Sequence, residues 1–578
     1  MNEERDFTQG CQFFITGNYS AAEVLLRRCL LTTPEDADVL NALGSVLDAL
    51  GSLEEAADCL NQACRLRPEC APFHFNRGNL LRKCGDWAGA ELEYIEAIQR
   101  DPCLAEAYHG LGSLYLAEDK IEHADACLQK AISLRNGFIL ALHDLGQLRH
   151  RKGIFDEAEQ YYRRSVVSDA PFPPALNSLG MLLLRKGELK EARSCFEKAI
   201  KLDQNYLLAR CNLAVLDAWS GNLGHAIDVL QQGAKDAPND ANIHFNLALA
   251  LLKAGRFKEG WREHEWRFTK SNPVPTRYGE ITRWHGESLT DKSILVHAEQ
   301  GYGDSLQFIR FVSLMASQGA MVLVEGQDRI ITPLLATVQG VAATLSRGEA
   351  LPFKPDYQVP MMSLPLELGV DGATPTIFKY LRPPEERVLL WYDALSGLPG
   401  IKIGIAWSGR SVHENDANRS ISREHLAPLF ELGGISWVSL QFDADKHPPP
   451  TIFMFDPRDG AVDFCDSAAL IAGLDLVITV DSAVAHLAGG LGVPVWLLLP
   501  WNSDWRWLHD RDESPWYPAM RIYRQKLEKT WGETIGIVAG ELYNHLKRNC
   551  FKMPECKSMI KEETPSALAA SLPSKGWT

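Results

Sequence analysis

Glycine and alanine recur in this chain with a fixed period, and that period limits what the first half can fold into. Six glycines fall on one 34-residue lattice: Gly10, Gly44, Gly78, Gly112, Gly146 and Gly180. Seven alanines form a second ladder with the same step: Ala22, Ala56, Ala90, Ala124, Ala158, Ala192 and Ala226. Such a period is typical of stacked helix pairs, in which small residues let the two helices approach closely. We therefore expect an α superhelix in this half.

Further ladders mark where the helices of each unit end and what fills the space between units. Proline cannot continue a helix, so it stands where the second helix of a unit stops: Pro34, Pro68, Pro102 and Pro238. Glycines mark the turn between the two helices: Gly17, Gly51, Gly85, Gly153, Gly187, Gly221 and Gly255. Leucines are expected to pack between neighbouring pairs: Leu43, Leu111, Leu145, Leu179, Leu213 and Leu247.

The pattern resembles the tetratricopeptide repeat, in eight units that run from residue 3 to about residue 270. We place this solenoid domain at residues 1–272. The resemblance implies a concave face that binds an extended polypeptide, with a spacer or a dimerisation surface as the alternative. Candidate side chains for that face are Asn41, Asn76, His143, Asn177, Asn212 and Asn246. The asparagines resemble the ladder in eukaryotic O-linked N-acetylglucosamine transferases; solvated polar positions are the other interpretation.

The lattice disappears after Pro273 and Pro275, and short apolar runs then alternate with helix-like segments, as in βαβ units around a parallel sheet. The predicted strands are Ser293–His297, Met321–Glu325, Ile401–Trp407, Trp437–Gln441, Leu476–Val480 and Val493–Leu499. Two prolines within residues 380–384 favour a linker. We therefore predict two doubly wound Rossmann-like lobes, residues 285–382 and 383–546, followed by a flexible tail at residues 547–578.

The loop after the first predicted strand contains Gly301, Tyr302, Gly303 and Asp304. Ligands of open parallel sheets bind beyond the carboxyl ends of the strands, so chemistry is expected in such loops. Asp304 stands at a helix start, where a carboxylate can also act simply as a cap. The lobe resembles bacterial heptosyltransferases, in which the corresponding Gly-Asp places an aspartate at the acceptor as general base. The resemblance makes Asp304 the candidate catalytic base and Gly301 and Gly303 candidate donor-binding residues.

The loop after Leu476–Val480 begins at Asp481 and resembles the donor-binding segment of the same enzymes. The helix start after it offers free backbone N–H groups and the positive end of a dipole to a diphosphate. We expect the amides of Ser482 and Ala483 to hold phosphate oxygens. The resemblance implies that Asp481 binds a sugar or ribose hydroxyl and that His486 faces the phosphates or orients the loop. A helical histidine tied to a core partner is the alternative for His486.

A third loop, residues 407–420, contains Arg410 and Arg419. The planar fork of donors on arginine suits phosphate recognition. Heptosyltransferase-like enzymes place a basic residue here to neutralise the leaving diphosphate, and Arg419 is the better positional match. Arg410 is open to interpretation as a solvated surface residue. Gln441 matches a position that contacts the nucleotide in the relatives. They often have a carboxylate there, so this residue does not indicate which nucleotide sugar is the donor.

Metal chemistry has weak support in the sequence. Asp443-Ala444-Asp445 has the spacing of the Asp-x-Asp motif of single-sheet glycosyltransferases, but the two-lobed family works without a metal, so we interpret it as a solvated acidic loop. His297, His413 and His425 are scattered rather than spaced as ligands. We expect no metal and no cofactor besides a nucleotide-sugar co-substrate. A tryptophan-rich stretch is interpreted as a packed lobe edge, with a sugar platform as the alternative: Trp501, Trp505, Trp507, Trp516 and Tyr517.

Composition narrows the class of protein. The formal charge of −15 argues against a general nucleic-acid binder, because such affinity rests on clustered lysine and arginine. The first ten residues are polar and acidic, unlike a secretory signal, and no window approaches the roughly 18 apolar residues of a membrane span. The 13 cysteines show no metal or disulfide spacing, and we expect reduced thiols in a cytoplasmic protein.

The whole chain resembles bacterial repeat-containing glycosyltransferases, some of which modify flagellin, with the two-lobed GT-B fold. The resemblance implies transfer of a hexosyl, heptosyl or nonulosonyl group from a nucleotide sugar to a Ser or Thr hydroxyl of a protein held by the repeats. A non-catalytic adaptor that retains the fold is the competing hypothesis, because a fold does not establish activity. Transfer to a lipid-linked saccharide is a third possibility.

Overall fold

In the computed structural model, the chain forms two compact units, Met1–Asn212 and Leu213–Thr578. The residues that the structure describes are 2–167, 172–270, 273–299, 301–372, 379–409, 415–441, 454–457, 462–526 and 531–550. The solenoid predicted for residues 1–272 therefore extends across both units.

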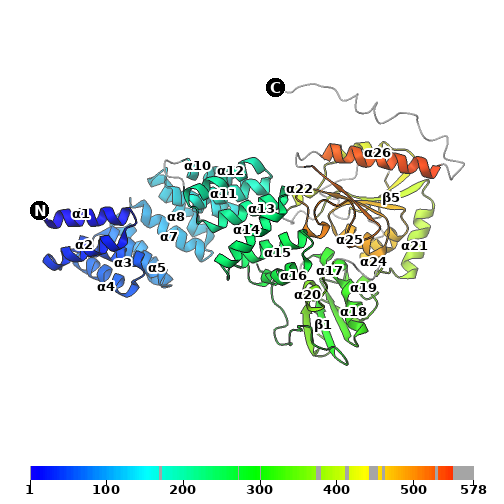
Figure 1. Cartoon of the computed structure of the whole chain (residues 1–578), viewed down its shortest axis with the longest axis horizontal. Helices are drawn as coiled ribbons and strands as arrows, with labels where there is room; N and C mark the ends of the chain where they lie inside the picture. The colour runs from blue at the N-terminus through cyan, green and yellow to red at the C-terminus, as the bar shows by residue number, and fades with distance from the viewer. Residues whose placement is uncertain are drawn as a thin grey trace, which may run out of the picture. The chain divides into compact units, whose positions relative to one another are not determined.

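The first unit consists of helix pairs that follow one another in sequence order (Figure 1). Its helices are α1 (Asn2–Ile15), α2 (Tyr19–Thr32), α3 (Ala37–Leu50), α4 (Leu53–Leu66), α5 (Ala71–Lys83), α6 (Trp87–Arg100), α7 (Ala105–Ala117), α8 (Ile121–Leu134), α9 (Ile139–Arg151), α10 (Phe155–Val166), α11 (Pro173–Lys186) and α12 (Leu189–Leu202). Helix α13 (Leu207–Trp219) crosses the boundary between the units. These pairs confirm the predicted helical solenoid.

The two small-residue ladders carry the packing within each pair. The seven ladder alanines have no exposed surface. A Cβ atom added at Gly146 would lie 2.5 Å from the ring of Tyr162, and one at Gly180 would lie 2.6 Å from the ring of Phe196. Each of these glycines thus provides the space for a large side chain of the following helix. The predicted close approach of the paired helices is confirmed.

The turns between paired helices use the left-handed backbone region. All seven predicted turn glycines have positive φ, between 75° and 95°. Asp119 occupies the same lattice position in the repeat that lacks this glycine, with φ of 59°. Aspartate tolerates this region better than most residues, because its short side chain forms local hydrogen bonds. The sequence pattern missed this turn because it was defined by glycine alone.

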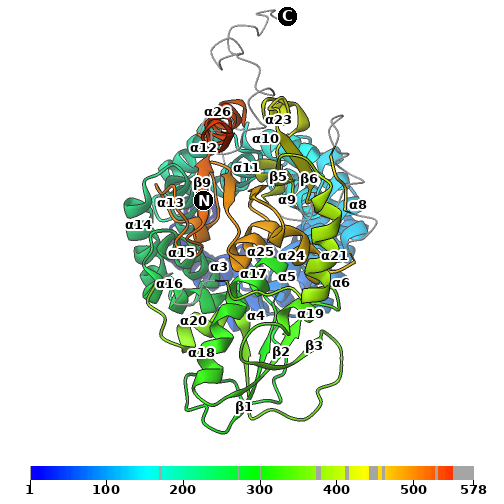
Figure 2. The same ribbon diagram turned by 90° about the vertical axis from the view of Figure 1, so that its right-hand side faces the viewer.

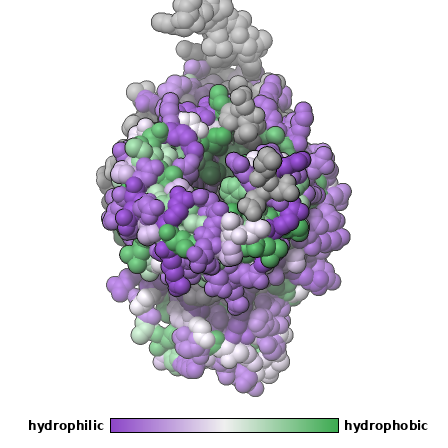
Figure 3. Space-filling model, turned by 90° about the vertical axis from the view of Figure 1, so that its left-hand side faces the viewer, coloured by the Kyte–Doolittle hydropathy of each residue, from purple (hydrophilic) through white to green (hydrophobic). Residues whose placement is uncertain are grey.

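The surface of the first helix pair includes several apolar side chains. Viewed from the side on which the chain begins, the molecule is mainly hydrophilic with scattered hydrophobic patches (Figure 3). In this pair Ile15 is 76% exposed, Val24 65% and Leu31 83%. Single exposed apolar residues of this kind are normal on soluble surfaces.

The second unit begins with the remaining repeat helices, which are α14 (Leu223–Asp236), α15 (Ala241–Lys253), α16 (Phe257–His264) and the 3₁₀ turn η1 (Glu265–Phe268). A first α/β segment follows: β1 (Ser293–His297), α17 (Tyr302–Phe308), η2 (Ile309–Phe311), α18 (Val312–Ser317), β2 (Met321–Gly326), α19 (Thr332–Leu335), β3 (Val341–Ser346), β4 (Tyr357–Pro360), η3 (Met361–Ser363) and α20 (Leu364–Glu367). Its four strands pair in parallel in the order β3-β2-β1-β4.

A second α/β segment completes the unit: α21 (Glu385–Ser396), β5 (Ile401–Ala406), α22 (Asp416–Arg419), α23 (Arg423–Phe430), β6 (Ile435–Ser439), α24 (Phe464–Ala472), β7 (Leu476–Val480), α25 (Ala483–Leu491), β8 (Val495–Leu499), η4 (Trp505–Trp507), β9 (Met520–Arg524) and α26 (Trp531–Cys550). Its five strands are parallel in the order β6-β5-β7-β8-β9. Helices α17 and α25 lie between the two sheets and contact each other (Figures 1 and 2).

Two apolar cores support the second sheet, one on each face. One core is continuous from Leu252 and Trp261 of the last repeat, through the first sheet, to Leu487 of α25. The other includes Ile405 of β5 and Ile535 of α26. The continuity of the first core explains why the last repeat helices and both sheets form one compact unit.

The predicted strands compare closely with the observed ones. Ser293–His297 and Leu476–Val480 have the predicted bounds, while the predicted Trp437–Gln441 is shifted and begins at Ile435. Strands β3, β4 and β9 were not predicted. The predicted linker is anchored rather than loose, because Tyr380 is buried and donates a hydrogen bond to the carbonyl oxygen of Leu306 at 2.7 Å. Among the described residues, no helix combines the length and the hydrophobicity required to cross a bilayer.

Candidate functional site

The strand order of the second sheet defines where a ligand fits. From β5 the chain moves outward to β6 and then returns to form β7 on the other side of β5. In open parallel sheets this reversal opens a crevice beyond the carboxyl ends of the two central strands. The loops at this crevice begin at Trp407 after β5 and at Asp481 after β7. The second and third predicted loops therefore meet at one edge of the sheet.

Helix α25 directs its N-terminus toward this crevice. Ser482 precedes the helix with an extended backbone, φ of −152°, and Ala483 is its first residue. The first N–H groups of a helix have no partner within the helix, so they are available to an anion. The hydroxyl of Ser482 lies 3.3 Å from that of Thr479. The predicted phosphate-binding amides thus stand at the position that the strand order favours.

Asp481 is surrounded by charges of both signs. Burial and the negative charge of Asp504 raise its pKa to about 6, while the cations of Arg419 and Arg506 act in the opposite direction. Its backbone carbonyl accepts a hydrogen bond from Arg419 Nη1 at 2.9 Å. The predicted donor residues Asp481 and Arg419 are therefore direct neighbours.

Arg419 is held close to the backbone of the neighbouring loop. It is 9% exposed, and its Nε donates to Asp416 Oδ1 at 3.2 Å. A Cβ atom at Gly409 would lie 2.2 Å from Arg419 Nη2, so only glycine leaves room for the guanidinium there. The predicted basic residue thus occupies a built position rather than the open surface.

Gln441 fixes the loop after β5. Its side-chain oxygen accepts hydrogen bonds from the backbone N–H of Trp407 at 3.3 Å and of Ser408 at 3.1 Å. The Ser408 hydroxyl is buried and makes no hydrogen bond to any residue that the structure describes. Gln441 therefore shapes the crevice through this loop, and its predicted contact with a nucleotide stays a prediction.

Asp304 lies in the first turn of α17. Its Oδ2 accepts a hydrogen bond from the Gly301 N–H at 3.2 Å, which is the capping contact, and its Oδ1 accepts one from Arg506 Nη2 at 2.6 Å. Burial raises the pKa of Asp304, and Arg506 opposes that rise. The side chain is 23% exposed. The carboxylate thus makes an ion pair in addition to the capping contact, and its predicted role as a base stays a prediction.

Gly303 brings the two candidate loops together. A Cβ atom there would lie 2.9 Å from His486 Cδ2, so the glycine permits the contact between α17 and α25. His486 is buried and stacks on Trp507. Its Nδ1 shares a hydrogen bond with the Tyr517 hydroxyl at 2.9 Å. Burial lowers its pKa well below the usual value, so the ring is neutral. These contacts agree with the core alternative; a role toward phosphates stays a prediction.

Arg506, in η4, is the main residue that the sequence analysis missed. Its guanidinium donates to Asp304 Oδ1 at 2.6 Å, to Asp504 Oδ1 at 2.9 Å and to Gln307 Oε1 at 2.8 Å. It is only 8% exposed. The sequence held no signal for it, because Asp304 lies 202 residues away and Arg506 stands among tryptophans interpreted as packing. That packing interpretation is confirmed, since all five aromatic residues of the stretch are buried.

The corresponding crevice of the first sheet is filled by the chain itself. In this sheet the strand order reverses between β1 and β4, and the segments that follow these two strands contain Glu299 and Ser363. Arg267 of η1 donates to both carboxylate oxygens of Glu299 at 2.8 Å and to the Ser363 hydroxyl at 2.7 Å. The arginine also pairs with Glu265 at 2.6 Å. The end of the repeat region therefore plugs the first crevice.

The asparagines predicted to bind a polypeptide pair with one another. Asn76 Nδ2 donates to Asn41 Oδ1 at 2.9 Å, and Asn212 Nδ2 donates to Asn177 Oδ1 at 2.8 Å. All of them are half-buried, as is Asn246 of α15. Each pair joins neighbouring first helices and leaves further donors and acceptors on each amide. The predicted contact with a polypeptide stays a prediction.

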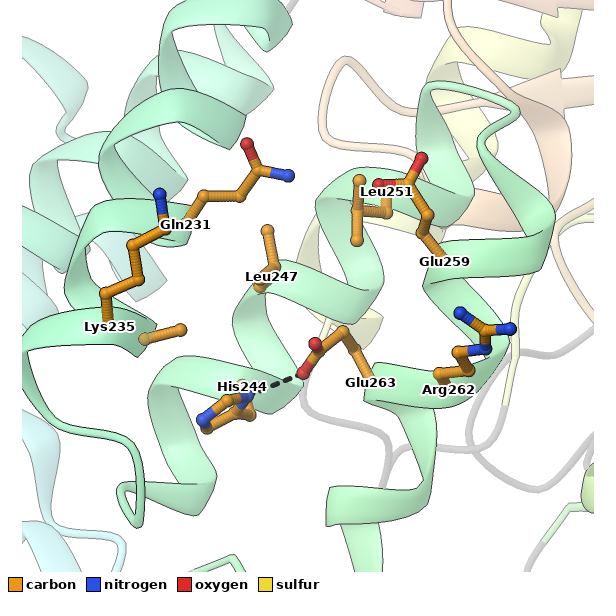
Figure 4. A pocket seen from close by; sticks show the side chains of 9 residues that line it. Gln231, Lys235, His244, Leu247, Leu251, Glu259, Arg262 and Glu263 are labelled. Carbon is orange, nitrogen blue, oxygen red and sulfur yellow. Dashed lines mark hydrogen bonds and ion pairs between the residues drawn. The ribbon is translucent and has the colours of Figure 1, made fainter.

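A groove of about 450 Å³ opens between α14 and α16, with α15 as its floor (Figure 4). Its floor includes Leu247 and Leu251, and His244 Nδ1 shares a hydrogen bond with Glu263 Oε2 at 2.6 Å. In earlier repeats an Arg–Glu pair spans the equivalent positions, as Arg163 and Glu191 do. Here glutamine stands in place of that arginine, so the groove is open on this side.

The remaining predicted residues lie away from this crevice or outside the described part of the chain. Arg410, His413, residues 443–445 and most of the predicted tail lie outside the described residues. His297 is buried and shares a hydrogen bond with Gln358, and His425 does so with the Ser422 hydroxyl. Within the described ranges, no three His, Cys, Asp or Glu side chains lie close enough together to hold a metal ion.

Comparison with known sequences identifies the helical region. Models described as tetratricopeptide repeat match residues 7–69, 49–103, 105–138, 141–173, 173–206 and 219–260. These residues therefore form an array of tetratricopeptide repeats. The chain is also 30% identical over 337 residues to Protein FlbA of Caulobacter vibrioides. That alignment covers 53% of this chain and 56% of FlbA, so the chain spans little more than half of that relative.

Several solved structures are similar at lower identity. The APC/C hetero-tetramer Cut9-Hcn1 matches at 21% identity and a TM-score of 0.39, over 44% of this chain and 51% of that chain. The pilF protein of Pseudomonas aeruginosa matches at 20% identity and a TM-score of 0.32, over 36% and 95%. YrrB, a repeat protein with an unusual peptide-binding site, matches at 20% identity and a TM-score of 0.25, over 32% and 95%.

Proposed function

We propose that the chain is a glycosyltransferase that moves a sugar from a nucleotide sugar to a Ser or Thr hydroxyl of a protein bound by its repeats. The observation that carries this proposal is the contact between α17 and α25, where Gly303 meets His486. That contact brings Asp304 and the N-terminus of α25 into one site. A carboxylate with a raised pKa and an anion-binding helix start are the two elements that sugar transfer from a diphosphate requires.

The proposed reaction begins with Asp304, which accepts the proton of the acceptor hydroxyl as its oxygen attacks the anomeric carbon. The bond between that carbon and the donor phosphate oxygen breaks, and its electron pair stays with the nucleotide. Arg419 and the amides of Ser482 and Ala483 stabilise the negative charge that develops there. Because these groups supply positive charge, we propose a reaction that requires no metal.

The donor belongs in the second lobe under this proposal. The crevice of the first sheet is filled by Arg267, whereas that of the second sheet is lined by the start of α25. The first lobe then faces the acceptor through Asp304. The resulting two-lobed arrangement corresponds to the GT-B organisation, with parallel sheets in both lobes as support.

The repeats serve as the acceptor-binding region in this proposal. Tetratricopeptide arrays commonly bind extended segments of other proteins. The paired amides, such as Asn41 with Asn76, retain further donors and acceptors for a peptide backbone. The resemblance to repeat-containing enzymes that modify flagellin makes flagellin the first acceptor to test.

One observation favours a second candidate function, a non-catalytic adaptor. Both carboxylate oxygens of Asp304 already accept hydrogen bonds, from Gly301 and from Arg506. A carboxylate held in this way can also be purely structural. Each oxygen has a second lone pair, however, so an acceptor hydroxyl can still be accommodated.

The decisive experiment measures transfer from radiolabelled UDP-, GDP-, ADP- and CMP-sugars to flagellin by the full chain. Asp304→Asn should lower kcat by about 10²–10⁴-fold, the usual contribution of a general base. Arg419→Ala should weaken donor binding by about 10–100-fold through loss of a charged contact. Arg521→Met, which removes an exposed pair with Glu541 away from the site, is the matched control. Undiminished transfer by Asp304→Asn would remove Asp304 from the mechanism, and a native chain that binds no nucleotide in calorimetry would favour the adaptor.

A further inference from the structure

Arg506 connects its own segment, around η4, to helix α17. Its Nη2 reaches Asp304 of α17, its Nη1 reaches Asp504 just before η4, and its Nε reaches Gln307, one turn after Asp304. The guanidinium also lies over the ring of Trp505, 4.4 Å from its centre. A planar fork with fixed donor directions can hold these acceptors together, whereas a point charge cannot. The carboxylate of Asp304 is therefore fixed in direction as well as in position.

The segment that carries Arg506 is itself anchored at several points. Lys253, the last residue of α15, is buried and donates to the Ser503 carbonyl oxygen at 3.1 Å. The Arg506 carbonyl oxygen accepts a hydrogen bond from Trp516 Nε1 at 2.7 Å. Arg524, at the end of β9, donates to the Ser503 hydroxyl at 2.8 Å. The anchors come from the last repeat, from the loop before β9 and from β9 itself.

The backbone after Arg506 is strained, which indicates that its position is enforced. Leu508 has φ of 53° and ψ of −168°, a region that residues with side chains rarely adopt. Arg524 Nη2 holds this conformation by donating to the carbonyl oxygens of Trp507 at 2.6 Å and of Leu508 at 3.1 Å. Such strain persists only where surrounding contacts require it, and it is often found at functional sites.

We propose that Arg506 is the positioning residue that orients Asp304 and keeps it ionised, and that the last repeat, through Lys253, holds Arg506 in place. This inference rests on the proposed role of Asp304 as the catalytic base. It means that the repeat region completes the transfer site in addition to binding an acceptor. Arg506 acts through Asp304 and need not touch the substrate.

The charges around this pair determine the sign of its pH dependence. Asp304 faces Arg506, Glu299 of the loop after β1 and Asp504. Arg506 additionally faces Asp481, and the buried rings of His264 and His486 lie within its field. Since burial raises the pKa of Asp304 and Arg506 lowers it, removal of the cation raises that pKa further. As the pH falls, a base that must be ionised is then protonated, and becomes inactive, at a higher pH than in the native chain.

The test compares the full-length native chain with three variants: Arg506→Met, Arg506→Lys and Lys253→Met. The probe is whichever UDP-, GDP-, ADP- or CMP-sugar the native chain uses, and kcat, donor KM and the pH profile are measured. Arg506→Met should lower kcat by about 10²-fold, as a misplaced catalytic group does, with unchanged KM and an acid limb at higher pH. Arg506→Lys keeps the charge and should retain the native acid limb while kcat falls.

Lys253→Met should shift the acid limb in the same direction as Arg506→Met but to a smaller extent, because Ser503 loses one of its anchors. Arg521→Met should match the native chain in every measurement. A native pH profile and kcat in Arg506→Met would overturn the proposal. If Arg506→Met does not fold, Arg506→Lys provides the test, because lysine keeps the positive charge. A displaced acid limb in that variant would overturn the proposal that the charge of Arg506 keeps Asp304 ionised.

A second measurement separates this inference from the proposed function. Thermal unfolding is recorded for Asp304→Asn, Arg506→Met and the double variant. If Arg506 orients Asp304, the double variant should lose less than the sum of the two single losses. Additive losses would overturn the pairing even in an active chain. If the native chain transfers no sugar but the losses are non-additive, the proposed function fails while the pairing stands.

Discussion

Replacing Arg267 with methionine tests how firmly the last repeat is joined to the first sheet. The guanidinium is 2% exposed and the side chain of Glu299 is 3% exposed, so the pair is almost completely removed from water. Loss of one partner of such a pair leaves an uncompensated buried charge and costs about 3–5 kcal/mol. Residues 213–578 form one compact unit. With an unfolding entropy of about 2.1 cal/mol/K per residue, each kcal/mol corresponds to roughly 1.3 °C for a unit of that size.

Arg267→Met should therefore lower the melting temperature of this unit by about 4–7 °C. The double variant with Glu299→Met should recover most of that loss, because a buried ion pair replaced by apolar residues is often neutral. A small deficit of about 1 kcal/mol should remain, since the Met362 N–H loses the Glu299 oxygen that accepts its hydrogen bond at 3.1 Å. Scanning calorimetry of the full chain measures both values. A double variant that melts as low as Arg267→Met would refute the electrostatic reasoning.

Three further outcomes follow from other contacts. Gly146→Ala should destabilise the first unit by about 1–3 kcal/mol, because its Cβ would lie 2.5 Å from the Tyr162 ring, whereas Gly224→Ala, which faces open space, should have little effect on melting. Burial lowers the pKa of His297 to about 4, so the stability that its neutral form contributes is present above pH 6.5. About 3 kcal/mol of it is lost as the pH falls toward 4. His297→Asn should therefore flatten the dependence of the melting temperature on pH in that range. Asn76→Ala should cost about 1 kcal/mol in the first unit, and a wild-type melting curve would show that the amide pair contributes nothing.

The repeat region could be predicted from sequence because its packing rules are local and repeated. Every unit meets the same steric demand, such as the space that Gly146 leaves for Tyr162, so the demand appears as a period. Asp119 shows the limit of this reasoning: the turn is present, but the residue that forms it is not glycine. A pattern based on residue type misses a conformation that two residue types can adopt.

The strands were predicted where they are continuous apolar runs. Leu476–Val480 is buried along its whole length, and its bounds were predicted correctly. Strand β3, Val341–Ser346, has two exposed residues near its start and lacks such a run. Its place in the sheet depends on pairing with β2, which is a tertiary contact and leaves little trace in the local sequence.

The candidate site divides in the same way. Asp481 could be named because it stands directly after a strand, and Asp304 because it lies in the first turn of the helix that follows one, where topology concentrates chemistry. Arg506 and Arg267 could not, because their partners are 202 and 32 residues distant and no motif surrounds them. Charged side chains that reach across the fold are specified by the assembled structure rather than by their own neighbourhood.

The division of the chain within α13 determines where a different repeat array can be fused to the α/β region. The helices after that division carry Lys253 and Arg267, whose partners lie in the α/β region. A gene fusion that joined foreign repeats at residue 272 would leave Ser503 without its lysine and Glu299 without its arginine. A fusion near residue 212 would keep both contacts. The upstream array can therefore be lengthened, shortened or replaced as a cassette, provided that the last repeats stay with the sheets.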